Sequence, residues 1–84
     1  MLIKDIVRDL EKNGTEGLYD YAGYFITEMQ RETWSDVIRG LETEDMELAY
    51  SALQDLQSMV TLSGPEAIMI AQATLQWFED FSGY

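Results

Sequence analysis

The sequence predicts an all-α protein, a compact bundle of four to five short helices that forms a single domain over residues 1–84. Apolar side chains recur every three or four residues along most of the chain, which is the pattern of amphipathic helices. Turn and cap residues interrupt this pattern, and neither a repeat nor a long linker divides it. Hydrophobic residues make up 46% of the chain, enough to form a core despite a formal net charge of -11.

The first predicted helix ends near Lys12. Asn13-Gly14 follows its last apolar position, where a residue with positive φ can end a helix. A two-residue hairpin turn is the alternative for this pair, but the flanking residues do not alternate between apolar and polar. The apolar face of this helix consists of Leu2, Ile3, Ile6, Val7 and Leu10.

The second predicted helix runs from about Glu16 to Gln30, although Gly23 weakens it. Tyr24 falls on the polar face of this helix, so we expect its side chain to be exposed. The buried stripe consists of Leu18, Ala22, Phe25 and Met29, widened by Tyr19, Tyr21 and Ile26.

Two threonines are predicted to cap the next two helices. Thr33 begins a third helix, which Gly40 suggests is brief, with Trp34, Val37, Ile38 and Leu41 buried. Thr43 begins a fourth helix that extends to about Val60. Apolar residues cover most of the surface of that helix, so its polar strip is predicted to be narrow. The strip consists of Glu47, Ser51, Gln54, Asp55 and Ser58.

The last helix is predicted to start at Ser63-Gly64-Pro65-Glu66, because proline is preadapted to the first helical position and an acid favours the positive helix end. Its buried face consists of Ala67, Ile68, Ala71, Thr74, Leu75, Phe78 and Phe81. Because the last two helices are the most apolar, we expect them at the centre of the bundle.

The charges are distributed unevenly along the chain. The 16 acids outnumber the five bases, and every base precedes Gly40. Eight acids and no base lie between Gly40 and Tyr84. Direct binding to nucleic acid or to an anionic membrane is therefore disfavoured, whereas a basic protein would be attracted.

The residues needed for common catalytic sites are missing. The chain has no Cys and no His, which excludes disulfides, thiolate nucleophiles, serine–histidine triads and the usual zinc sites. Pairs of acids at helical spacing, Glu28/Glu32 and Glu44/Glu47, could hold Mg²⁺, but no Lys or Arg follows Arg39 to hold phosphates. The sequence therefore predicts a protein that is not an enzyme and has no cofactor or metal.

The favoured functional hypothesis is a binding protein that presents a negative surface to a basic partner. Its target would be a nucleic-acid-binding protein, such as a nuclease, restriction enzyme or CRISPR effector, which it would inhibit by acting as a DNA mimic. Exposed tyrosine beside acids is a common interface composition. The predicted partner-binding residues are Glu42, Glu44, Asp45, Glu47, Asp55, Tyr24, Glu79 and Asp80.

The alternative hypothesis is an assembly or regulatory subunit, for example a homodimer whose apolar helix faces pack against another chain. The near-continuous apolar girth of the last two helices favours it. The most apolar stretch, residues 67–75, is much shorter than the roughly 20 residues that a membrane span needs. We therefore expect a cytoplasmic protein that does not bind membranes.

Overall fold

The computed structural model describes residues 2–82 of the chain, without the side chains of residues 62, 81 and 82, so the predicted burial of Phe81 lies outside the described residues. The described chain contains α-helices and short 3₁₀ turns but no strand, which confirms the all-α prediction. The α-helices are α1 (Ile3–Asn13), α2 (Thr15–Tyr19), α3 (Glu28–Glu42), α4 (Met46–Met59) and α5 (Pro65–Ser82). The 3₁₀ turns are η1 (Ala22–Tyr24) and η2 (Val60–Leu62).

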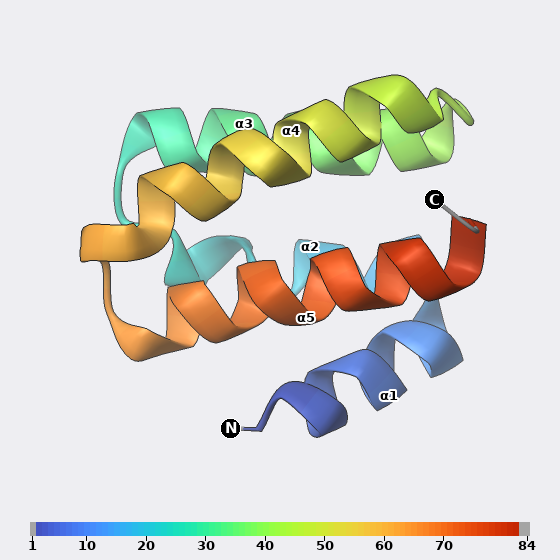
Figure 1. The fold of residues 1–84 in the computed structure, drawn as a ribbon, viewed down its shortest axis with the longest axis horizontal. Helices are drawn as coiled ribbons and strands as arrows, with labels where there is room; N and C mark the ends of the chain where they lie inside the picture. The colour runs from blue at the N-terminus through green and yellow to red at the C-terminus, as the bar shows by residue number, and fades with distance from the viewer. Residues whose placement is uncertain (1, 83–84) are drawn as a thin grey trace.

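The last two helices lie at the centre of the bundle, as predicted. α5 packs against α1 on one side and α4 on the other, and α4 packs in turn against α3 (Figure 1). The short α2 bridges α1 and α3. Both central helices therefore bury apolar side chains on two sides, which explains the wide apolar girth of their sequences.

All five α-helices contribute to one buried core. Its largest fully buried side chains include Trp34, Phe25, Phe78, Leu10 and Leu53. The polar strip predicted for α4 is correct, since Glu47, Ser51, Gln54, Asp55 and Ser58 are all exposed. The predicted end of α1 and start of α5 are also correct, with Gly14 following α1 at a φ of 62° and Pro65 beginning α5, whereas the predicted stop at Gly83 lies outside the described residues.

The prediction of one helix from Glu16 to Gln30 is wrong. The segment forms α2 and η1, and the chain then becomes extended before α3, with Thr27 as the N-cap whose side chain accepts a hydrogen bond from the Gln30 backbone N–H at 3.1 Å. Phe25 is buried against Trp34, with ring centroids 4.9 Å apart. Ile26 and Met29, predicted to be buried, are 71% and 64% exposed because the helix that would have buried them is broken.

A buried glutamine fixes this break to another part of the bundle. The Gln30 side-chain amide donates to the Met59 carbonyl at 3.2 Å and to the Ser63 hydroxyl at 2.8 Å. Its oxygen accepts from the Ile26 backbone N–H at 3.2 Å. These bonds join the start of α3 to the α4–α5 connection, and they satisfy polar atoms that burial would otherwise leave without partners.

The predicted start of the third helix at Thr33, and its predicted brevity, are also wrong. Thr33 lies within α3, where its hydroxyl donates to the Met29 carbonyl at 2.9 Å. Gly40 does not end the helix. It allows α3 to approach α4, because a Cβ at Gly40 would lie 2.6 Å from the backbone nitrogen of Ala49.

The turn between α3 and α4 is a Schellman motif. The Asp45 N–H donates to the Gly40 carbonyl at 2.7 Å, and the Glu44 N–H donates to the Leu41 carbonyl at 3.4 Å. The prediction of Thr43 as the next N-cap is therefore wrong, because Thr43 closes α3. Asp45 caps α4 instead, accepting a hydrogen bond from the Leu48 N–H at 3.2 Å.

Candidate functional site

The structure brings four of the predicted binding residues together at one turn. Glu42 ends α3, Glu44 and Asp45 form the connection, and Glu47 lies in the first turn of α4. All four side chains are exposed. We call this group, Glu42, Glu44, Asp45 and Glu47, the acidic turn.

No lysine or arginine of the described residues forms a salt bridge with the acidic turn. Within residues 2–82, the one salt bridge joins Arg39 to Asp36, both on α3. The remaining bases are Lys4, Arg8 and Lys12 on α1 and Arg31 near the start of α3. The carboxylates of the acidic turn are therefore free to attract cationic groups of another molecule.

The backbone at the acidic turn is unusual because Glu44 has a φ of 59°. This position of a Schellman motif is usually glycine, since a side chain raises the energy of the left-handed conformation by about 1–2 kcal/mol. Among the described non-glycine residues, Glu44 alone has a positive φ. A charged side chain is thus kept at a position where glycine would be more stable.

A tyrosine that the sequence analysis assigned to the core lies beside the acidic turn. The Tyr19 hydroxyl of α2 donates to Glu42 Oε1 at 2.7 Å, and the side chain is 55% exposed. This hydrogen bond, followed by desolvation and the Glu42 charge, raises the pKa of Tyr19. Only the break after α2 reveals the exposure of this residue, so the sequence carried no signal for it.

Asp55 lies farther along α4, on the same exposed strip as Glu47 and Ser51. Residues four apart share a helix face, so the strip continues the negative surface away from the acidic turn.

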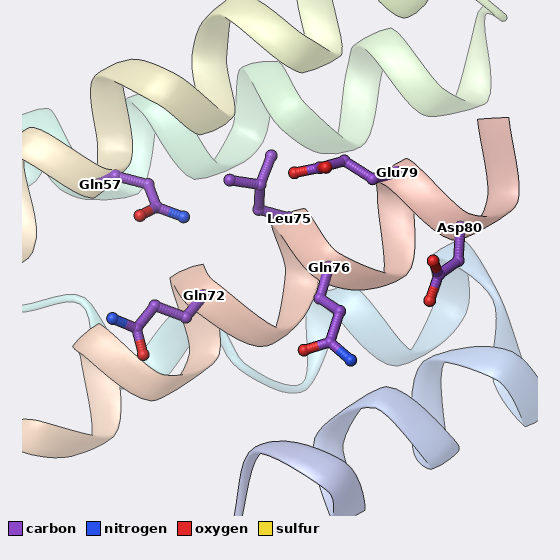
Figure 2. A pocket seen from close by; sticks show the side chains of 6 residues that line it. All are labelled: Gln57, Gln72, Leu75, Gln76, Glu79 and Asp80. Carbon is purple, nitrogen blue, oxygen red and sulfur yellow. The ribbon is translucent and has the colours of Figure 1, made fainter. Parts of the chain in front are cut away.

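Glu79 and Asp80 line an open groove with a volume of about 260 Å³ along α5. The other lining residues are Gln57 of α4 and Gln72, Leu75 and Gln76 of α5. Figure 2 shows the two carboxylates pointing in different directions, with that of Glu79 directed toward Leu75. The groove is rich in amide and carboxylate groups, which makes it a polar surface with both donors and acceptors.

Tyr24, another predicted binding residue, belongs to η1 and not to the acidic turn. Its side chain is 43% exposed, and its ring centroid is 6.3 Å from that of Tyr21. The Tyr21 hydroxyl in turn donates to Asp9 of α1 at 2.8 Å. Burial, together with this hydrogen bond, raises the pKa of Tyr21 to about 12.

Within the described residues, no group of three or more acids, cysteines or histidines is placed to hold a metal ion. Glu44 and Glu47 do not share a helix face, because Glu44 precedes α4. No helix in the described part of the chain is long and apolar enough to cross a membrane.

Comparison with protein families, curated proteins and solved structures finds no match to this chain.

Proposed function

We propose that this chain is a small acidic binding protein that inhibits a basic, nucleic-acid-binding protein by occupying its nucleic-acid site. The observation that carries the proposal is the acidic turn, where four exposed carboxylates have no cationic partner. In this proposal the chain has no enzymatic role and acts in the cytoplasm. Its partner is an enzyme such as a nuclease, a restriction enzyme or a CRISPR effector.

Carboxylates can substitute for phosphates because both attract Lys and Arg side chains. Attraction between oppositely charged surfaces accelerates association and weakens as salt increases, since the Debye length falls from about 30 Å at 0.01 M to about 8 Å at 0.15 M. Glu44 supports a binding role because it places a charge where the backbone favours glycine. Strain of this kind often marks residues retained for function.

The first test uses the protein as bait in a bacterial lysate, with bound proteins eluted by a salt gradient and identified. Each captured basic protein is then purified, and its binding to nucleic acid is measured with and without this chain. We expect competition for the nucleic-acid site that weakens as salt increases. The proposal is contradicted if none of the captured proteins shows this competition. It is also contradicted if the bait captures only further copies of itself.

The acidic turn is tested with two variants that remove equal charge and keep side-chain shape. The turn variant combines Glu42→Gln, Glu44→Gln, Asp45→Asn and Glu47→Gln. The control variant combines Asp5→Asn, Glu11→Gln, Glu28→Gln and Glu32→Gln, all at exposed positions. Asparagine is also a good N-cap, so α4 should remain intact in the turn variant.

We expect the turn variant to lose roughly tenfold or more in affinity for the partner and the control variant to lose much less. Equal losses in the two variants would mean that net charge, and not the acidic turn, determines binding.

Self-assembly is a second candidate function, and a specific observation favours it. Ile26 and Met29 are the most exposed large apolar side chains, and they lie close together at the start of α3. The apolar side chains of α4 and α5, by contrast, are buried or partly buried within the chain. Light scattering should show a dimer that the pair Ile26→Ser and Met29→Gln converts to monomer; a wild-type monomer contradicts this candidate.

A further inference from the structure

A second groove lies beside the acidic turn, between the α2–η1 segment and α3. Its volume is about 340 Å³, within the range of roughly 300–1,000 Å³ typical of ligand pockets. Trp34 and Ile38 are buried and lie at its base, and Ala22 adds a further apolar surface. Tyr19 and Glu42 lie at its exposed rim.

The rim of this groove carries an uncompensated negative charge. Glu42 accepts a hydrogen bond from the Tyr19 hydroxyl. Because this hydroxyl is neutral, the hydrogen bond does not compensate the negative charge of Glu42. Arg39 also lines the groove, but its guanidinium is paired with Asp36. Glu44 and Asp45 follow Glu42 in the acidic turn, so the apolar base is bordered by carboxylates.

We propose that this groove receives an apolar or aromatic side chain of the basic partner, next to Lys or Arg residues that pair with Glu42 and the acidic turn. The inference rests on the proposed function and names the feature of the partner that provides specificity. Charge attraction steers many basic proteins to the surface, whereas a side chain that fills a pocket discriminates among them. Tyr19 and Glu42 are thereby assigned to the interface.

The test uses two synthetic peptides as probes, Lys-Lys-Phe-Lys-Lys and Lys-Lys-Ala-Lys-Lys. Each is titrated into isotope-labelled protein at low salt, and amide chemical shifts report both affinity and location. We expect the Phe peptide to bind about tenfold more tightly than the Ala peptide, because burial of the ring removes apolar surface from water. Its shifts should centre on Ser35, Ile38 and Glu42.

A substitution that fills the groove provides the matched test. Ser35→Trp adds a ring at an exposed position that lines the groove, and Thr61→Trp adds the same ring at an exposed position in η2 that does not line it. Ser35→Trp should reduce the affinity of the Phe peptide to that of the Ala peptide, and Thr61→Trp should leave it unchanged. If Ser35→Trp fails to fold, the shift map of the wild-type protein still decides the question.

The outcomes separate this inference from the proposed function. Equal affinity for the two peptides, with shifts confined to the acidic turn, overturns the groove but leaves a basic partner in place. Absence of binding by both peptides at about 0.01 M salt, where attraction is long-ranged, overturns both proposals. A third peptide, Glu-Glu-Phe-Glu-Glu, tests the charge of the partner. If it binds the groove more tightly than Lys-Lys-Phe-Lys-Lys, the assignment of a basic partner is overturned.

Discussion

The close packing of α3 against α4 depends on Gly40, and Gly40→Ala tests that dependence. An added Cβ would lie 2.6 Å from the Ala49 backbone nitrogen and 3.0 Å from the Ala49 Cα. Because the contact is with the backbone of α4, no side-chain rotation can relieve it. The two helices would have to move apart in the core of the molecule.

The magnitude follows from two opposing effects. Overpacking of a core destabilises by about 1–3 kcal/mol. Alanine in place of glycine within a helix recovers up to about 1 kcal/mol. We therefore expect Gly40→Ala to lower the free energy of unfolding by about 1–2 kcal/mol, which corresponds to a decrease in Tm of roughly 5–15 °C for a chain of this size.

Urea unfolding followed by far-UV circular dichroism measures this change, with Gly23→Ala as the matched control. A Cβ at Gly23 meets nothing within 4 Å, so that variant should be as stable as the wild type or up to about 1 kcal/mol more stable. If Gly40→Ala is as stable as Gly23→Ala, the close approach of α3 and α4 does not exist in solution and the reasoning is refuted.

Three further predictions test other features. Gln30→Leu should destabilise by about 1–3 kcal/mol in urea unfolding, because it removes the hydrogen bonds that the buried Gln30 amide makes with the part-buried Ile26 N–H and Met59 carbonyl, while the exposed Gln54→Leu should change little. Glu44→Gly should raise the free energy of unfolding by about 1 kcal/mol, because it relieves the positive φ; an unchanged or lower value would contradict the assigned turn. The raised pKa of Tyr21 means that its contribution to stability is complete below about pH 10 and is lost as the pH rises toward 12. Tyr21→Phe should therefore lose less stability than the wild type between pH 9 and 12 in thermal unfolding, and a parallel loss would show that Tyr21 is not involved.

Only part of the candidate site could be predicted from the sequence. The base-free second half of the chain pointed to the acids, and four of them do lie at one turn. Sequence alone placed Tyr24 with these acids and Tyr19 in the core, whereas Tyr19 binds Glu42 and Tyr24 lies against Tyr21. The pairing of α2 with the end of α3 is a long-range contact, so no local pattern indicates it.

The sequence by itself determined the helical class, α1, α5, and the exposed strip and central position of α4. Those features depend on apolar periodicity and on local signals such as Pro65, which act within a few residues. The tertiary structure alone decided the break before α3, the role of Gly40 and the turn at Glu44. Each depends on a partner distant in sequence or on a conformation unusual for its residue: Phe25 packs on Trp34, Gly40 contacts α4, and Glu44 adopts a backbone conformation that glycine usually supplies. Local propensity cannot encode such contacts, because their energy exists only once the helices have packed.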